Sequence, residues 1–197
     1  EAMAEKQVTV DNATHALEDL FLVIATQNPL DQVGTYPLPA AQLDRFLFKV
    51  QMTYLTREAE LEVLANKYPH CQTDTSATND VVQAAITASP ADIVEARTAM
   101  QHNILVNPKI QEALVDIAVG LRTDPRVRQG LSTRSLVVAI PALQARALTQ
   151  GRDFVSPDDV KALSTPIFKH RLELMPGVSD ADEVIDDVMA PIMEAIA

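Results

Sequence analysis

The sequence predicts a small α/β segment over residues 1–55, followed by an all-helical domain over residues 56–197, so that the chain is mostly helical overall. Two observations support this fold class. Residues 20–25 form a continuous apolar run, which is typical of a strand buried on both faces of a parallel sheet. Further along, a polar capping residue directly followed by proline occurs repeatedly and marks the starts of helices. These caps are Ser89, Asn107 and Ser156.

In the first segment, residues 7–10 alternate polar and apolar side chains, residues 11–12 supply turn chemistry, and residues 14–17 form a returning arm. This pattern predicts a short hairpin. A second buried strand is expected at residues 46–50, after a proline-containing loop over residues 29–39 that no helix can cross. Because so small a sheet is not stable alone, we expect it to belong to a larger α/β unit whose other strands precede it.

The helical domain begins at Thr56, which can cap a helix, and continues through the three capped helices named above. Ser132 is expected to start a helix that runs to about Gln150, and Pro141 should kink or split it. A last helix is expected to start at Ser179 and to run close to the end of the chain. Together these helices predict a small bundle.

Composition limits the class of protein. Apolar residues make up 47% of the chain and charged residues 22%, which is ordinary for a soluble globular protein and too apolar for a disordered one. No run of apolar residues is long enough to span a membrane, and no basic-then-apolar leader opens the chain. The single cysteine, Cys71, cannot form an internal disulfide, which fits a cytoplasmic location.

The net charge of −11 opposes non-specific binding to nucleic acid or anionic lipid. Four arginines nevertheless fall within residues 122–134, which predicts a local cationic site. They are Arg122, Arg126, Arg128 and Arg134. The chain contains no GxGxxG or GxxxxGK[ST] motif, so taken alone it has no phosphate-binding loop.

Familiar hydrolase and metal motifs are missing from the sequence. It has no nucleophile elbow and no HExxH motif. His70 and Cys71 are adjacent and cannot by themselves surround a tetrahedral metal ion. The acidic residues of 180–187 suit the N-terminal turns and the solvated face of the last helix. The sequence therefore predicts no metal site.

Three positions are candidates for chemistry. Asn28 follows the expected buried strand at the edge where open α/β sheets bind ligands, although a plain turn residue before proline would also fit. Arg45 precedes the next strand, and its alternative is an ion pair with Asp44 or with another acid. Arg134 lies two residues after Ser132, where a cation opposes the helix dipole and calls for a compensating anion. Its alternative is an ordinary surface arginine.

Several motifs of the chain share one family resemblance. The first part contains, in order, EAM at 1–3, QVTV at 7–10, ATQNP at 25–29, GTYPLP at 34–39 and AQLDRF at 41–46. The later part contains RVRQGLSTR at 126–134, GRDFVSPDDVK at 151–161 and HRL at 170–172. The first group resembles the second half of the ATPase core in the MoxR family of AAA+ proteins. The second group resembles the second sensor and the lid of that family.

The resemblance implies a P-loop NTPase core of the AAA+ type followed by a helical-bundle lid, in a homo-oligomeric and hexameric ring. By motif position, Asn28 would be sensor 1 and would orient the attacking water. Arg45 would be the arginine finger that reaches the nucleotide of a neighbouring subunit, and Arg134 would be sensor 2 on the lid. These roles suit phosphoryl transfer, which depends on positioned charge and on the fixed donors of a guanidinium.

The resemblance also shows what this chain does not contain. The family's Walker A lysine and Walker B acids, the main ligands of ATP and Mg²⁺, lie upstream of Glu1. We therefore expect a C-terminal fragment with negligible hydrolysis of its own. Two positions depart from the family pattern: Thr133 stands where proline is frequent, and Ala40 where glutamate is frequent.

The expected function is that of the C-terminal part of a MoxR-type AAA+ ATPase, which couples ATP hydrolysis to chaperone-like remodelling or maturation of a client enzyme. The resemblance implies a von Willebrand factor A-type partner protein, and the net charge of −11 predicts no nucleic-acid partner. One alternative is a non-catalytic interaction module in which the lid binds a partner. Another is a related AAA+ motor, helicase-like or magnesium chelatase-like, although the negative charge speaks against a DNA motor.

Overall fold

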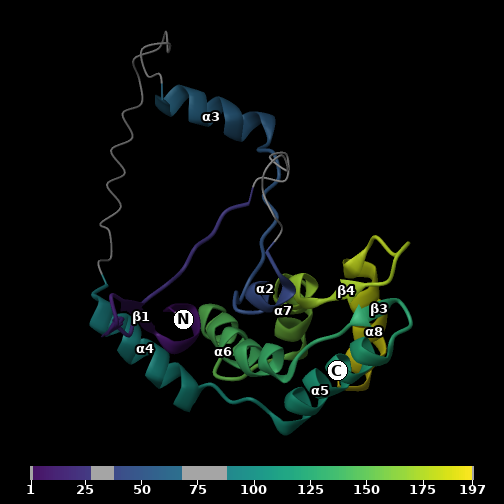
Figure 1. Cartoon of the computed structure of the whole chain (residues 1–197). Coiled ribbons are helices and arrows are strands. Elements are labelled where there is room, and N and C mark those ends of the chain that lie inside the picture. Colours follow the sequence, from purple (N-terminus) through teal and green to yellow (C-terminus); the bar gives the residue numbers. More distant parts are fainter. Residues whose placement is uncertain (1, 28–37, 68–87, 197) are drawn as a thin grey trace. The chain divides into compact units, whose positions relative to one another are not determined.

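The computed structural model describes residues 2–27, 38–67 and 88–196 (Figure 1). Most of the described residues are helical. In chain order the elements are α1 (Ala2–Glu5), β1 (Gln7–Val10), β2 (Ala13–Ala16), α2 (Ala40–Leu43), α3 (Arg57–Lys67), α4 (Pro90–Asn103), α5 (Pro108–Thr123), β3 (Val127–Gln129), α6 (Thr133–Thr149), α7 (Pro157–Phe168), the 3₁₀ helix η2 (Lys169–Arg171), β4 (Glu173–Leu174) and α8 (Ala181–Ile196).

The chain divides into two compact units, residues 1–49 with 89–197, and residues 50–88. The second unit contains α3, which begins where the sequence predicts it. The Thr56 hydroxyl accepts a hydrogen bond from the Ala59 N–H at 3.3 Å. Helix α3 buries none of its residues, and Leu61 is 50% exposed. Local capping, rather than packing within its own unit, therefore accounts for its start.

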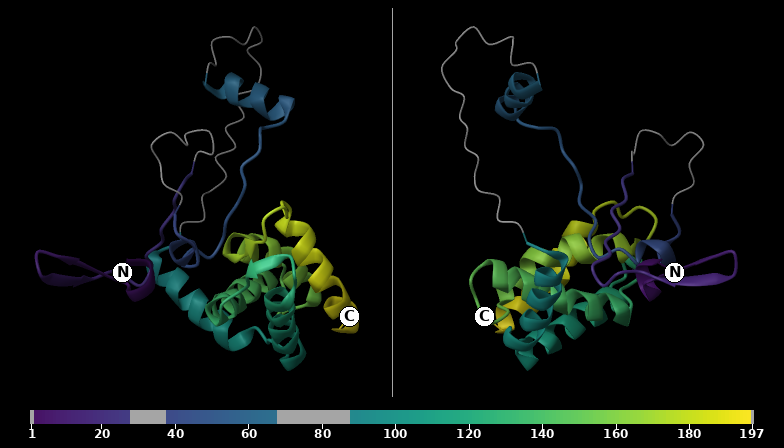
Figure 2. Two further views of the ribbon diagram at one scale, coloured as in Figure 1. Left: turned by 45° about the vertical axis from the view of Figure 1, so that its right-hand side comes forward. Right: turned by 90° about the vertical axis from the view of Figure 1, so that its left-hand side faces the viewer.

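The predicted hairpin is confirmed. β1 pairs antiparallel with β2, with Val10 opposite Ala13 (Figure 2). Asp11 and Asn12 have φ angles of 49° and 62°, the left-handed conformations that a two-residue turn of type I′ requires. The returning strand starts one residue earlier than expected because these two residues alone make the turn.

The two buried strands expected at residues 20–25 and 46–50 are not present. Both segments lie outside the named strands, and large apolar side chains in them are exposed. Leu22 is 77% exposed, Ile24 82% and Val50 71%. A strand needs a neighbouring strand to satisfy its backbone N–H and C=O groups, and no strand among the described residues pairs with either segment. The two segments are apolar as noted, but within the part of the chain that the structure describes they form no sheet.

Residues 88–196, which are called the lid from here on, contain helices α4 to α8. Local side-chain hydrogen bonds account for the starts of these helices. Ser89 and Asp92 form a reciprocal capping box, with N···O distances of 2.7 and 3.2 Å. Ser156 and Asp159 form a second one. The Asn107 side chain accepts the N–H of the second residue of α5 at 2.9 Å. All three predicted caps are confirmed.

Two other helix predictions need adjustment. Helix α6 follows Ser132 as expected and runs unbroken through Pro141, so that proline does not split it. Helix α8 starts two residues later than predicted, because Asp180 rather than Ser179 caps it. The Asp180 carboxylate accepts a backbone N–H of the first turn at 2.9 Å.

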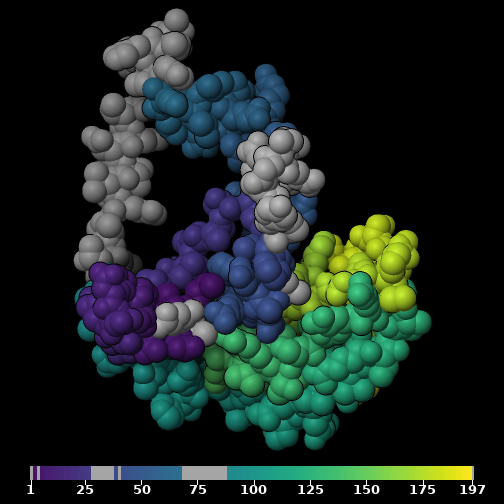
Figure 3. All heavy atoms as spheres, in the orientation of Figure 1, coloured from purple at the N-terminus to yellow at the C-terminus, as the bar shows by residue number. Residues whose placement is uncertain are grey.

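The hydrophobic core lies in the lid, where α5 packs against α8, and α6 packs against α4 and α7. Figure 3 shows these helices as one continuous surface. The buried residues of α5 are Ile110, Ala113, Leu114, Ile117, Ala118 and Leu121. Strands β3 and β4 pair antiparallel. In the chain, β3 follows α5 and β4 follows η2. None of the described helices is both long and apolar enough to cross a membrane.

Candidate functional site

The four arginines of residues 122–134 do not form one cationic site, which corrects the expectation from the sequence. Three of them have structural partners. Arg122 donates to the Leu131 carbonyl at 2.7 Å, Arg126 pairs with Asp124 at 2.8 Å and Asp187 at 2.6 Å, and Arg128 pairs with Glu173 at 3.0 Å. Arg134 is exposed and makes no hydrogen bond or ion pair with the described residues. Within residues 2–27, 38–67 and 88–196, Arg134 is therefore the member of this group for which no partner is observed.

A close backbone approach sets the course of the chain into α6. A Cβ atom added at Gly130 would lie 2.8 Å from the Arg122 Cα and 2.7 Å from its Cγ. Only glycine therefore fits this contact between α5 and the segment that precedes Ser132. The contact fixes the entry into α6, which carries Arg134 in its first turn.

Arg45 follows the short helix α2, in a turn that its own backbone closes. The Arg45 N–H donates to the Gln42 carbonyl at 3.2 Å, and the Phe46 N–H donates to the Leu43 carbonyl at 3.0 Å. The Arg45 side chain is exposed and makes no hydrogen bond or ion pair with the described residues. The alternative of an ion pair between Arg45 and Asp44 is therefore not observed.

Asp44 instead contacts the lid. Its carboxylate accepts hydrogen bonds from the Ser132 hydroxyl at 3.3 Å and the Ser135 hydroxyl at 3.4 Å. The Arg171 Nε lies 3.5 Å from the same carboxylate. Asp44 thus places a negative charge at the N-terminus of α6, where the helix dipole favours an anion. Asp44 forms no ion pair with the Arg134 side chain among the described residues, so the anion expected at Arg134 is not observed there.

The chain just after Arg45 is also held by the lid, through its backbone. The Phe46 carbonyl accepts hydrogen bonds from the Arg171 Nη2 at 2.7 Å and from the His170 Nε2 at 3.0 Å. Three residues on, the Lys49 N–H donates to the Pro166 carbonyl at 3.0 Å. Arg45 therefore projects from a segment that is fixed on both sides to the end of α7 and to η2.

Burial determines the charge states of the two lid residues in this contact. Burial lowers the pKa of His170 below its ordinary value, and the Nδ1 atom is buried without a hydrogen-bond partner among the described residues. The ring is therefore neutral, with its proton on Nε2 toward the Phe46 carbonyl. Burial also lowers the pKa of Arg171, while the charge of Asp44 opposes this and that of Arg134 adds to it.

The predicted site residues thus fall into two groups. Asn28 lies outside the described residues. Arg45 and Arg134 are both exposed, and the hydrogen bonds of Asp44 join the two segments that carry them. The contact residues Asp44 and Arg171 had no assigned role, although each belongs to a motif of the sequence. Nothing in the sequence indicated their pairing, because the two residues are 127 positions apart in the chain.

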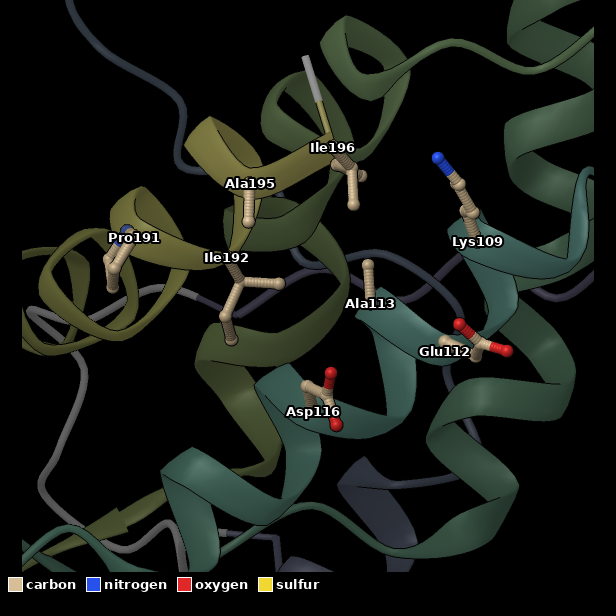
Figure 4. A pocket seen from close by; sticks show the side chains of 8 residues that line it. All are labelled: Lys109, Glu112, Ala113, Asp116, Pro191, Ile192, Ala195 and Ile196. Carbon is tan, nitrogen blue, oxygen red and sulfur yellow. The ribbon is translucent and has the colours of Figure 1, made fainter.

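A separate hollow lies between α5 and α8 and has a volume of about 290 Å³ (Figure 4). Aliphatic side chains of α8 form one wall, and Lys109, Glu112 and Asp116 of α5 form part of the other. Neither Arg45 nor Arg134 lines it. Both arginines are exposed and lie outside this hollow. His70 and Cys71 lie outside the described residues.

A second ion network stabilises the lid internally. The Asp159 carboxylate, 1% exposed, accepts hydrogen bonds from Arg152 at 2.6 and 2.7 Å and from the Ser156 N–H at 2.9 Å. Burial alone would raise the pKa of Asp159, but these hydrogen bonds outweigh it and hold the pKa below its ordinary value. No group of this network contacts Arg45 or Arg134 among the described residues, so its role is structural.

Comparison with known proteins agrees with this geometry. Residues 1–48 match the family described as "ATPase family associated with various cellular activities (AAA)", and residues 119–192 match the AAA lid domain. A crystal structure of a Cytophaga hutchinsonii protein described as an ATPase superposes with a TM-score of 0.81 at 30% identity, over 96% of this chain and 58% of that one. The fold is that of an AAA+ ATPase: the end of the core, followed by the helical lid.

Curated relatives identify the family within this class. Chaperone MoxR1 of Mycobacterium tuberculosis is 33% identical over 96% of this chain and 49% of its own length. Protein MoxR of Methylorubrum extorquens is 26% identical over 98% of this chain and 60% of its own. The Bacillus subtilis protein YeaC, which is uncharacterized, is 37% identical over the whole chain and 58% of its own length. These matches support a C-terminal region of a MoxR-family AAA+ ATPase, and the chain spans about half the length of these relatives.

Proposed function

We propose that the full-length protein couples ATP hydrolysis to chaperone-like remodelling or maturation of a client protein. The observation that carries the proposal is the state of Arg45, whose side chain is exposed and unpaired among the described residues while both of its neighbours are anchored to the lid. An exposed guanidinium on a fixed backbone can bind an anionic group of another molecule. One relative, Chaperone MoxR1, is named as a chaperone, which supports a chaperone-like task.

In this proposal Arg45 is the arginine finger of a homo-oligomeric, hexameric ring and acts on the nucleotide of the neighbouring subunit. Its guanidinium is always charged and presents a rigid set of donors, which suits the charge that develops on a transferring phosphoryl group. A finger of this kind must protrude from its own subunit. The exposure of Arg45 meets that requirement.

Arg134 is proposed as sensor 2, which binds the phosphates from the first turn of the lid helix α6. A cation at that position is disfavoured by the helix dipole and is stabilised when an anion approaches. Asn28, as sensor 1, would orient the attacking water. These roles make the lid and the end of the core two sides of one nucleotide site.

The described residues fit a nucleotide phosphate, because two exposed guanidinium groups are available for it. ATP, when bound, supplies the γ-phosphoryl group that is transferred to water. Among the described residues no group of three or more His, Cys, Asp or Glu side chains could hold a metal ion. The ligands of Mg²⁺ would thus come from other parts of the protein. Because its sequence has no GxxxxGK[ST] motif, we also propose that this chain alone hydrolyses little ATP.

The proposed surroundings follow the family. The partners would be a von Willebrand factor A-type protein and a client enzyme, in the cytoplasm, where a single cysteine such as Cys71 stays reduced. No nucleic acid is proposed as a partner, since the net charge is −11.

The test is ATP turnover by the full-length protein with Arg45→Ala beside the wild type. We expect turnover to fall about 10³-fold while ATP binding is retained. Arg128→Ala is the matched control, because Arg128 is an exposed arginine whose partner Glu173 is itself exposed. Turnover of Arg45→Ala within a factor of a few of the control would rule out the finger. A wild type that neither binds nor hydrolyses ATP would favour an interaction module instead.

A further inference from the structure

One carboxylate joins the two candidate arginine segments. Asp44 directly precedes Arg45, and it accepts hydrogen bonds from Ser132 and Ser135 at the start of the helix that carries Arg134. The two hydroxyls also lie 3.2 Å from each other. Ser135 is fully buried, so this end of the contact is shielded from solvent. A shift of the α6 N-terminus therefore displaces Asp44, or breaks these hydrogen bonds.

Arg171 holds the same segment from the other side. Its side chain is 2% exposed, its Nε lies 3.5 Å from Asp44, and its Nη2 donates to the Phe46 carbonyl at 2.7 Å. The two contacts bracket Arg45, one on the residue before it and one on the residue after it. The guanidinium is planar and rigid, so a single side chain contacts both points, through a hydrogen bond to Phe46 and through an ion pair with Asp44 in which Nε makes no hydrogen bond with the described residues. Hydrogen bonds away from water are also stronger than exposed ones.

We propose that Arg171 is a positioning residue, which fixes the backbone of Arg45 and, through Asp44, couples it to the N-terminus of α6. This rests on the proposed function, in which Arg45 acts on a neighbouring nucleotide. A movement of the lid then changes the direction in which Arg45 projects. The lid of one subunit thereby controls hydrolysis at the site of the next.

The design of the test depends on separating positioning from stability. Asp44→Asn keeps the shape and removes the charge, whereas Arg171→Lys keeps the charge and removes the fork that spans Asp44 and Phe46. Arg152→Lys is the control: it makes the same exchange in the ion pair with the buried Asp159, which lies within the lid and does not contact Arg45. Thermal unfolding of all three variants measures the loss of stability that they share.

Two measurements on the full-length protein then distinguish positioning of Arg45 from a general loss of stability. In the nucleotide-free protein, amide hydrogen exchange over residues 40–49 should be faster in Asp44→Asn and Arg171→Lys than in the wild type, and unchanged in Arg152→Lys. In steady-state ATP hydrolysis, the first two variants should lose about 10²-fold in kcat with little change in KM, the size of effect expected of a misplaced catalytic group. Arg152→Lys should retain turnover near the wild-type value. The double variant Asp44→Asn/Arg171→Lys should be no slower than the worse single variant, since both remove one linkage.

The linkage is the coupling of Arg45 to the N-terminus of α6 through Asp44 and Arg171, and each outcome decides for or against it. Unchanged exchange over residues 40–49 would overturn it, and so would faster exchange with kcat no lower than that of Arg152→Lys. Additive losses in the double variant would also contradict a single linkage. The exchange measurement needs no hydrolysis, so it tests the contact even where Arg45→Ala shows that Arg45 is not a finger. Failure of the linkage and failure of the proposed function are thus distinguishable.

Discussion

The Nε atom of Arg171 lies 3.5 Å from the Asp44 carboxylate, and this ion pair joins the end of the ATPase core to the lid. The Arg171 side chain is almost fully buried, whereas that of Asp44 is 26% exposed. A buried guanidinium is costly unless its partners are kept, because its charge has been removed from water. The segment that carries Arg45 therefore contacts the lid through Asp44, a partner that the buried charge of Arg171 requires.

Arg134→Ala in the full-length protein should weaken ATP binding and abolish the nucleotide-dependent movement of the lid. The reason is that Arg134 is exposed in the first turn of α6 and has no partner among the described residues. Titration with a fluorescent ATP analogue measures the affinity. Arg128→Ala, an exposed arginine outside the proposed site, should bind as the wild type does. Equal affinity in the two variants would contradict the role of sensor 2.

The protein should lose stability as the pH falls below the ordinary pKa of His170. Burial lowers the pKa of His170 from its ordinary value of 6.5, so that the unfolded state binds its proton at a higher pH than the folded state. The neutral form therefore contributes stability that is fully present above pH 6.5 and is lost as the pH falls toward the folded pKa. Of the charged groups facing the ring, Arg171 and Lys49 lower the pKa further, and Asp44 opposes them.

Urea unfolding at a series of pH values between about 7.5 and 5 checks this dependence. In His170→Gln the loss of stability across this range should be smaller than in the wild type. His102→Gln, which changes an exposed histidine of α4, should follow the wild type. Parallel curves for all three proteins would show that His170 titrates alike in the folded and unfolded states.

Asp159→Asn should destabilise the lid by about 3 kcal/mol, because it leaves the Arg152 guanidinium without its carboxylate partner at a buried position. Asp158→Asn, the exposed neighbour in the first turn of α7, is the control and should change stability by less than about 0.5 kcal/mol. Denaturant unfolding at neutral pH measures both.

The same carboxylate also governs stability in acid. The pKa of Asp159 is held below its ordinary value of 3.8, so its contribution is present above that pH and is lost as the pH falls through the folded pKa. The Asp159→Asn variant should lack this part of the acid unfolding. A mutant whose stability matches that of Asp158→Asn would show that the Arg152 network does not stabilise the lid.

Features fixed by neighbouring residues could be predicted from the sequence. The caps at Ser89, Asn107 and Ser156 depend on side chains that reach a backbone N–H within the same turn, and all three were predicted. The hairpin turn at residues 11–12 is local in the same sense. The strand predicted at residues 20–25 was wrong, because a strand depends on a partner and a local apolar run cannot supply one.

The candidate site was predictable only in part. Motif position singled out Arg45 and Arg134, and the structure leaves both exposed. The sequence could not show which of several arginines has a partner, because the acids that pair with Arg126 and Arg128 include residues far along the chain. For the same reason the contact between Asp44 and Arg171 was missed.

The central claim is that Arg45 completes the active site of a neighbouring subunit. A mixture of full-length subunits carrying Arg45→Ala with subunits whose phosphate-loop lysine is replaced tests it most directly. Each variant alone should be inactive, but a mixed ring would contain sites that combine an intact nucleotide pocket with an intact Arg45. We expect the mixture to recover a measurable part of wild-type ATP turnover. A mixture as inactive as its two components, although mixed rings form, would contradict the claim.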